Sequence, residues 1–419
     1  MAVYYVSEGT GSDETGDGSQ GNPWGTVRYA LDHMSGPDVL YFATILIAHN
    51  KPNAGINGYV RTYFVDPANG TDDGSHGNRD GDGAWASLQY ALDSVDAAGS
   101  NAWIFCTGSE SPSATIDVDT GGGANGRWKI VEGYGTDPRD GGYYVIDGQD
   151  SLTTGMEWAN VDGILLANLH IKNCTGEGMN FGNPGSDSGQ VCWRCWVEAV
   201  QYGFRSQNSA NSPVLLFCKA RAQTGFELAY AQPAICVGCY AYNCSTRGYS
   251  TQSRAVFYRC VAKDCGDGFL AYSSRAVCIG CLACGCSGDG FAMANRYGIL
   301  VGLESIAKSC GNRGFDRYDG DYNTWGLWVN CCAHGNGINF YDYAPVDGLL
   351  QADPQLVDAA GEDFRLKSSS PCFNGGVEGL HNVLTQQQFA HIGPHVQRFL
   401  FPVISRAARV GNPQGAAML

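Results

Sequence analysis

The sequence predicts an all-β solenoid, in which short parallel strands are coiled into stacked turns. Two observations lead to this prediction: an internal repeat between residues 169 and 340, and the absence of helical periodicity within that repeat. Aligning the chain on Cys-x-Ala followed by Gly-aromatic gives steps of 25, 22, 23, 20, 22, 24 and 25 residues. The aligned column, one residue per turn, reads Met179, Phe204, Phe226, Tyr249, Phe269, Phe291, Phe315 and Phe340.

Each repeat has room for short strands separated by Gly, Ser and Asn turns, as at Val256-Phe257 and Val277-Cys278-Ile279. The chain has 58 glycines against 15 prolines, so it is rich in turns without being a proline-rich linker. No turn carries an apolar 3.6-residue period long enough for two helices, and the Leu-x-x-Leu-x-Leu core of leucine-rich repeats is absent. A coiled parallel sheet remains, with neighbouring turns about 4.8 Å apart.

Cysteines recur once per turn and should stack above one another. One column reads Cys195, Cys218, Cys239, Cys260, Cys281 and Ser305; a second reads Cys244, Cys265, Cys286 and Cys310; a third reads Cys192, Cys236 and Cys278. The spacing Cys-x-x-Cys in two turns is typical of zinc sites. In an extended strand, however, residues three apart face opposite sides, so we favour packing of small apolar thiols inside the coil. No export signal follows Met1, and we therefore expect free thiols made in a reducing compartment.

The start of the chain carries the same strand-loop-helix unit twice, with Trp24 and Trp85 at equivalent positions. The second copy has apolar residues at i, i+3, i+4 and i+7, namely Leu88, Ala91, Leu92 and Val95. A helix laid across an open solenoid end would cover exposed strand edges, so we expect this copy to be the N-terminal cap. The first copy, within residues 1–60, either adds a layer or docks on a partner.

A tail, residues 394–419, follows the predicted solenoid of residues 61–393. It contains the apolar run 399–404 and then a basic residue; the side chains expected to make contacts are Phe399, Phe401, Ile404 and Arg406. An apolar run outside a solenoid requires burial, which another subunit or partner would provide. Folding back along the side of the same coil is the alternative.

Two end segments, together with the stacked columns, resemble those of the right-handed parallel β-helix family of pectin and pectate lyases and phage tailspikes. They run from Tyr63-Phe64-Val65-Asp66-Pro67 to Trp85-Ala86-Ser87-Leu88, and from Asp353-Pro354 through Asp363-Phe364 to Ser370-Pro371. The resemblance covers about residues 63–393. It implies a right-handed parallel β-helix solenoid with an N-terminal capping helix and a C-terminal extended tail, but this fold hosts many functions.

The resemblance also implies candidate sites. Lyases of this fold use a basic residue beside acidic calcium ligands, which suggests Arg254 and Arg275 as catalytic candidates. Tailspike-type hydrolases use paired carboxylates on the coil surface, for which Asp316 and Asp319 are the best candidates. Aromatic residues nearby would bind carbohydrate, namely Tyr318, Tyr322 and Trp325. A plain turn insertion is the alternative interpretation of this segment.

An acidic loop near the start supplies oxygen ligands that suit calcium: Asp72, Asp73, Asp80 and Asp82. Its spacing matches no known calcium loop, and no other cofactor is expected. Lys and Arg number 26 against 41 Asp and Glu, a net charge of −15, which disfavours binding to nucleic acid or an anionic membrane. The longest apolar stretch, ten residues from Val39 to Ala48, is too short to span a bilayer.

The first functional hypothesis is a virion-associated structural or adhesion protein of spike, fibre or head-decoration type, assembled in the host cytoplasm. Its expected partners are further copies of itself, other virion proteins and a cell-surface polysaccharide; the tailspike resemblance implies a trimer. The alternative is a polysaccharide lyase or glycoside hydrolase, secreted without a visible signal peptide. A third hypothesis is a calcium-dependent adhesin.

Overall fold

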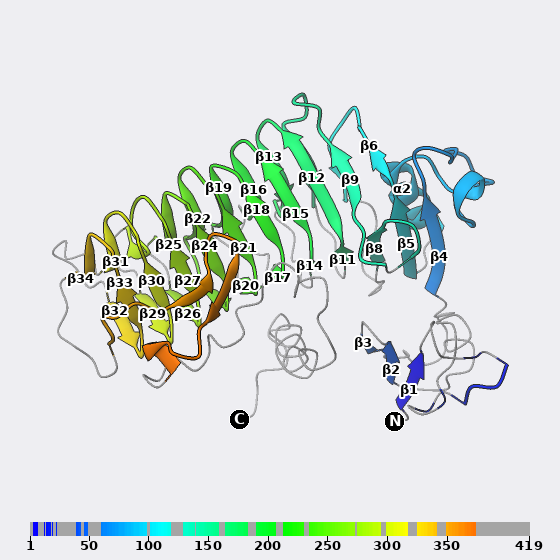
Figure 1. Ribbon diagram of the computed structural model, residues 1–419. Coiled ribbons are helices and arrows are strands. Elements are labelled where there is room, and N and C mark those ends of the chain that lie inside the picture. Colours follow the sequence, from blue (N-terminus) through cyan, green and yellow to red (C-terminus); the bar gives the residue numbers. More distant parts are fainter. Residues whose placement is uncertain are drawn as a thin grey trace, which may run out of the picture. The chain divides into compact units, whose positions relative to one another are not determined.

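A computed structural model confirms the parallel β-helix (Figure 1). It describes residues 3–6, 12, 14–17, 19, 22, 39–42, 46–48, 60–98, 101–118, 129–138, 140–158, 164–182, 190–206, 213–229, 234–272, 275–294, 299–316, 325–341 and 349–373. The chain divides into two compact units: Thr62–Phe389, and Met1–Arg61 together with Ala390–Leu419. The predicted tail contacts at Phe399, Phe401, Ile404 and Arg406 lie outside the described residues, as does the first-copy helix.

Three parallel sheets form the solenoid, and each coil adds one strand to each sheet. Sheet 1 contains β4 (Val60–Val65), β5 (Asn101–Thr107), β8 (Lys129–Tyr134), β11 (Ile164–Ala167), β14 (Gln190–Trp193), β17 (Val214–Leu216), β20 (Ala234–Val237), β23 (Ala255–Tyr258), β26 (Arg275–Ile279), β29 (Ile299–Leu303) and β32 (Trp325–Val329).

Sheet 2 contains β6 (Ser109–Glu110), β9 (Tyr144–Asp147), β12 (Leu169–Cys174), β15 (Trp196–Ala199), β18 (Lys219–Arg221), β21 (Tyr240–Tyr242), β24 (Val261–Lys263), β27 (Leu282–Cys284), β30 (Ile306–Lys308) and β33 (Cys332–His334). Sheet 3 contains β7 (Ile116–Asp117), β10 (Thr154–Glu157), β13 (Glu177–Asn180), β16 (Tyr202–Ser206), β19 (Thr224–Leu228), β22 (Arg247–Thr251), β25 (Asp267–Ala271), β28 (Phe291–Met293), β31 (Arg313–Asp316) and β34 (Ile338–Tyr341).

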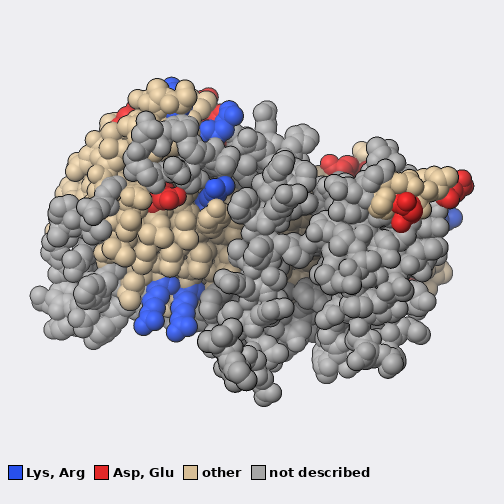
Figure 2. All heavy atoms as spheres, turned by 90° about the horizontal axis from the view of Figure 1, so that it is seen from below, with Lys and Arg blue, Asp and Glu red and all other residues tan. Residues whose placement is uncertain are grey.

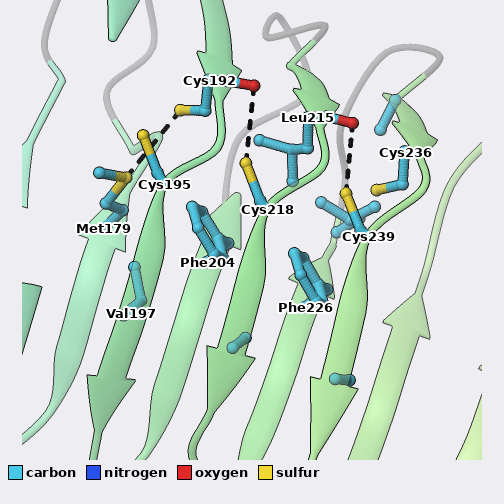
Figure 3. Packing of buried hydrophobic residues seen from close by; sticks show 14 of the residues in the cluster. Met179, Cys192, Cys195, Val197, Phe204, Leu215, Cys218, Phe226, Cys236 and Cys239 are labelled. Carbon is cyan, nitrogen blue, oxygen red and sulfur yellow. Dashed lines mark hydrogen bonds between the residues drawn. The ribbon is translucent and has the colours of Figure 1, made fainter. Parts of the chain in front are cut away.

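The cysteine columns pack inside the coil as predicted. All 18 cysteines are free and buried. The first column follows a sharp corner between sheets 1 and 2, where residues such as Arg194, Phe217 and Gly238 have φ of 54°, 55° and 60°. Each thiol then donates to a carbonyl of the preceding coil, as from Cys218 to Cys192 at 3.5 Å (Figure 3). The zinc alternative gains no support, because no cluster of metal ligands occurs among the described residues.

The predicted capping helix, α2 (Leu88–Ala98), buries its four apolar positions against the first coil. Its residue Gln89 also covers the free edge of β7: the side-chain amide donates to the carbonyl of Asp117 at 3.2 Å and accepts from its N–H at 2.7 Å. In a continued sheet, a neighbouring strand would bond to this same carbonyl and N–H of Asp117. No helix in the described part of the chain is long and apolar enough to cross a membrane.

Glu110, at the end of β6, lies beneath α2 and accepts a hydrogen bond from the Leu88 N–H at 3.3 Å. Burial raises the pKa of this carboxyl from 4.5 to about 7, and the bond from Leu88 opposes that rise in part. The folded protein therefore holds this proton more tightly than the unfolded chain, so stability is lost as pH rises from about 4.5 to 7.

We expect Glu110→Gln to increase the free energy of unfolding by up to about 3 kcal/mol at pH 8, because a neutral amide avoids the cost of burying a charge. At pH 4, where the wild-type carboxyl is protonated, the two proteins should be nearly equal in stability. Urea unfolding at both pH values tests this. An equal change at pH 4 and pH 8 would show that titration of Glu110 plays no part.

A C-terminal hairpin, β35 (Leu356–Asp358) and β36 (Asp363–Leu366), covers part of the outer face of sheet 2 (orange in Figure 1). Its buried residues Leu356, Phe364 and Leu366 pack with outward residues of sheet 2 such as Leu282 and Ile306. Short 3₁₀ turns occur at η1 (Gly81–Gly83) and η2 (Pro371–Phe373).

In the N-terminal unit, β1 (Val3–Val6) pairs in parallel with β2 (Val39–Phe42), which pairs antiparallel with β3 (Leu46–Ala48).

Candidate functional site

The two candidate basic residues lie on neighbouring coils at the start of sheet 1 strands. Arg275 is the first residue of β26, and Arg254 directly precedes β23. Because Ala255 pairs with Ala276, the two arginines occupy equivalent positions one coil apart. Both side chains are exposed. They are therefore available to an anionic partner, although like charges this close repel one another.

Asp316, the candidate carboxylate, is not free on the surface. It ends β31 and is 3% exposed, and its Oδ2 accepts a hydrogen bond from Arg313 at 2.7 Å. The guanidinium of Arg313 also stacks on Tyr341, 3.8 Å from the ring centroid. The other candidates predicted for this site, Tyr318, Asp319 and Tyr322, lie outside the described residues. Trp325 begins β32 and pairs with Ile299, but only its backbone is described.

In the acidic loop, the first two candidate calcium ligands are engaged in local hydrogen bonds. Asp72 accepts from the N–H groups of Ala86 and Ser87, at 2.8 and 3.0 Å, just before α2 begins. Asp73 accepts from His76 Nδ1 at 2.6 Å, and this bond contributes most to lowering the pKa of the carboxyl. Both carboxylates thus shape the loop and the start of α2.

The other two candidate calcium ligands, Asp80 and Asp82, are each engaged in separate interactions. Asp80 caps η1 through the Gly81 N–H at 2.7 Å and accepts from the Tyr134 hydroxyl at 2.8 Å. Asp82 forms an exposed ion pair with Arg79 at 3.0 Å. Among the described residues, no three His, Cys, Asp or Glu side chains converge as metal ligands. The calcium hypothesis therefore has no assembled ligand set in this part of the chain.

A further cluster, not anticipated from the sequence, lies on the outward side of sheet 3. We call it the charged face; it comprises Glu157, Glu177, Tyr202, Arg205, Glu227 and Arg247. Register places these residues on five successive strands, β10 to β22. Arg205 pairs with Glu227 across β16 and β19, and Glu177 pairs with Tyr202 across β13 and β16. The cluster thus runs along the solenoid axis.

Arg205 is the centre of the charged face. Its guanidinium forms an ion pair with Glu177 and lies 4.1 Å from the ring centroid of Tyr202. Arg247, two coils further on, lies 4.9 Å from the ring of Tyr272. Glu227, on the coil between the two arginines, is 7% exposed. Cations, carboxylates and aromatic rings therefore alternate along one side of the coil.

Two carboxyls of this face have raised pKa values. Burial raises the pKa of Glu227, while a bond from Ser250 and the charges of Arg247 and Arg205 oppose that rise. Burial also raises the pKa of Glu157, and the nearby carboxylates Asp117 and Glu177 raise it further. Such carboxyls hold their protons to a higher pH than ordinary surface acids do.

Several buried polar atoms on or beside the charged face have no hydrogen-bond partner among the described residues. They are Asn180 Oδ1, Arg205 Nε, Glu227 Oε2 and Arg247 Nε. Buried polar atoms in native proteins are usually satisfied, so a group of such atoms indicates a place where water or a polar ligand binds.

His170 belongs to a different network, on the outer face of sheet 2. Its Nε2 lies 3.1 Å from Glu198, and its ring stacks on Trp196 at 4.0 Å. Glu198 also accepts from Arg221 at 3.0 Å and Tyr242 at 3.2 Å. Because each of these groups is bonded, the network is best explained as structural.

Comparison with known proteins supports the fold. The chain is similar to the solved structure of pectate lyase Pel9A, with a TM-score of 0.52 and 16% identity over 74% of this chain and 90% of that one. A rhamnogalacturonan lyase aligns over 93% of this chain and 97% of that one, with a TM-score of 0.42 and 12% identity. No protein-family model and no curated protein matches the chain. The likeness to Pel9A shows the shared parallel β-helix.

Proposed function

We propose that this protein is a structural or adhesion β-helix that binds an extended polysaccharide along its charged face. The observation that supports this most is the alternation of Glu177, Arg205, Glu227 and Arg247 on successive coils. Nearby, Asn180 Oδ1 and Glu227 Oε2 are buried and bond to no other described residue. A sugar polymer lying along the solenoid axis would meet a carboxylate or a guanidinium group on each of these coils, about every 4.8 Å.

The chemistry of the face suits sugars. Carboxylates accept hydrogen bonds from hydroxyls, guanidinium groups donate them, and the rings of Tyr202 and Tyr272 hold the two guanidinium groups by stacking. The expected setting is a virion assembled in a host cytoplasm, in which the protein forms a homo-oligomer with other virion proteins as neighbours. Trimerisation is proposed from the tailspike resemblance.

The second candidate function is polysaccharide cleavage, as a lyase or a glycoside hydrolase. The raised pKa values of Glu227 and of Glu157, the latter near the carboxylates Asp117 and Glu177, favour it, because glycoside hydrolases use one protonated and one ionised carboxyl. In a lyase, Arg254 or Arg275 would be the base, with calcium as cofactor. One similar solved structure is that of a pectate lyase, so that reaction class is the one to assay.

Affinity electrophoresis of the full chain in gels containing polygalacturonate, alginate or neutral dextran tests the proposal. We expect retardation by at least one polymer, and at least tenfold weaker retardation for Arg205→Gln. Arg365→Gln is the matched control, since Arg365 also pairs with a carboxylate, Asp363, but lies on the exposed hairpin. Thermal melts would verify that both variants are folded.

Absence of retardation by all three polymers, or equal loss in Arg205→Gln and Arg365→Gln, would overturn binding at the charged face. Release of reducing ends or of ultraviolet-absorbing unsaturated products in the same mixtures would instead favour the enzyme. Glu227→Gln and Arg275→Ala would then distinguish a hydrolase from a lyase.

A further inference from the structure

A segment near the C-terminal end of the described chain folds back along the outer side of sheet 2. We call residues 349–373 the strap; it contains β35, β36 and η2 (orange in Figure 1). The strap starts beside the last coil, where Leu350 forms a bridge with Cys332 of β33. It reaches back to the coil of β21, where Glu362 accepts a hydrogen bond from the Tyr240 hydroxyl at 3.0 Å.

The strap then returns to its starting point, and this brings two cysteines together. Cys372, in η2, and Cys332, the first residue of β33, belong to one buried apolar cluster on the outer side of sheet 2. The Cys332 thiol donates to the Ala352 carbonyl at 3.2 Å. Two residues further on, the Pro354 carbonyl accepts from Ser370 Oγ at 2.6 Å, and this oxygen accepts from the Cys372 N–H at 3.2 Å. Both cysteines therefore lie at the base of the strap.

The two thiols interact directly. A hydrogen bond between them lowers the pKa of Cys372, although burial opposes this, and the same bond together with burial raises the pKa of Cys332. Cys372 is therefore the thiol of the pair that ionises more readily. The thiolate is the form that attacks a disulfide, so Cys372 is the expected nucleophile.

The other cysteines have different surroundings. Members of one column inside the coil keep the strand spacing, about 4.8 Å, between their Cβ atoms, whereas a disulfide requires about 3.8 Å. Pairs within one turn, such as Cys236 and Cys239, are enclosed in the core, and a reagent reaches them only if coils separate. In contrast, η2 is a three-residue turn that directly follows the exposed residues 367–369 and the buried Ser370. Such a turn opens locally at lower cost than a coil does.

Polar contacts hold the strap only weakly. Lys308 pairs with Asp353 at 2.6 Å, and Lys219 lies 4.0 Å from Glu362. Ion pairs near the surface contribute little to stability. Seen from below, the described part of the solenoid carries few charged side chains (Figure 2). A covalent bond at the base of the strap would therefore add a constraint that ionic contacts do not provide.

We propose that Cys332 and Cys372 are a redox-sensitive pair, which forms a disulfide in an oxidising environment and thereby fixes the strap on sheet 2. The oxidant is a small disulfide of the glutathione type. The Cys372 thiolate attacks one of its sulfurs, which gives a mixed disulfide and releases one small thiolate. The Cys332 thiolate then attacks the Cys372 sulfur, which forms the protein disulfide and releases the second small thiolate. The two protons lost by the protein thiols pass to the two small thiolates.

A chain made in a reducing compartment would carry both thiols there and gain the bond after release. The proposal does not depend on polysaccharide binding, because the strap lies on a different sheet from the charged face. Retardation by polysaccharide should accordingly be the same for the reduced and the oxidised protein. A failure of the proposed sugar binding would leave the thiol chemistry unchanged.

Mass spectrometry of the full chain, alkylated in denaturant, tests the pairing before and after incubation with oxidised glutathione. We expect 18 alkylated cysteines in the reduced protein and two fewer after oxidation, with peptide mapping that links Cys332 to Cys372. Cys372→Ser should lose no further thiol on oxidation. Cys284→Ser is the matched control, because Cys284 is also a buried cysteine of the same outer cluster, and this variant should still form the bond.

Trypsin cleavage after Arg365, which is exposed on β36, reports whether the strap is fixed. Oxidation should slow this cleavage at least about fivefold in the wild type and in Cys284→Ser, but not in Cys372→Ser. The comparison of reduced and oxidised wild type needs no substitution, so misfolding of a variant cannot produce the result. An unchanged thiol count, or a disulfide between other cysteines, would overturn the pairing. A Cys332–Cys372 disulfide without slower cleavage would overturn its effect on the strap.

Discussion

Gly268→Ala is expected to lower the free energy of unfolding by about 3 kcal/mol or more. A Cβ at this position would lie 2.4 Å from the carbonyl oxygen of Gly290 in the next coil and 2.9 Å from the Cβ of Ala283. The first contact is with backbone that is itself held in sheet 3, so the coils would have to separate. Urea unfolding followed by far-ultraviolet circular dichroism would measure the loss.

Gly74→Ala is the matched control. Nothing lies within 4 Å of a Cβ built at Gly74, so the same substitution there should change stability by less than about 0.5 kcal/mol. A Gly268→Ala protein as stable as the wild type would mean that the coils can shift apart at low cost. The close packing of successive coils would then not be the main constraint on this position.

The same clash explains the repeat pattern from which the fold was predicted. A Cβ added at Gly225 would lie 3.1 Å from the Cβ of Ala241, and one added at Gly248 would lie 2.9 Å from that of Ala262. The Ala of Cys-x-Ala and the Gly of Gly-aromatic are therefore two sides of one tight contact. Periodicity alone predicted that these positions recur once per coil, but not that they meet.

The charged face was harder to predict from the sequence. Its residues Arg205 and Glu227 directly follow the aligned aromatics Phe204 and Phe226, so they form a column of their own. That column changes chemical type at each coil, to Ser250 and then Leu270, whereas core columns repeat one type. Core packing imposes similar residues on each coil because the space is the same, but an outer face has no such constraint.

The candidates Arg254 and Asp316 also show how far surface sites can be predicted from the sequence. Arg254 and Arg275 each stand six residues before a cysteine of the first column, which indicates equivalent positions, and register confirms this. The sequence could not show that Asp316 is already held by Arg313, three residues earlier on the same strand. Whether a carboxylate is free depends on side-chain direction at the end of a strand, which repeat alignment does not report.

Phe226→Ala is expected to cost 3 to 5 kcal/mol of unfolding free energy, roughly the loss found for large aromatic truncations in cores. Phe226 is fully buried, and its ring stacks at 5.0 Å on Phe204 in the preceding coil and at 4.7 Å on Tyr249 in the next. Removing it opens a cavity between two rings that the backbone holds apart, so the cavity cannot collapse. Urea unfolding at constant pH would measure the cost.

Phe340→Ala makes the same change at the end of the ladder. Phe340 is only partly buried and stacks on a single ladder ring, that of Phe315 at 5.3 Å, so its loss should cost clearly less than that of Phe226. Each interior ring fills the gap between two coils, whereas the last one fills a gap on one side. Equal costs at both positions would contradict this account, because they would mean that neither full burial nor a second stacked ring adds to the stability of the coil.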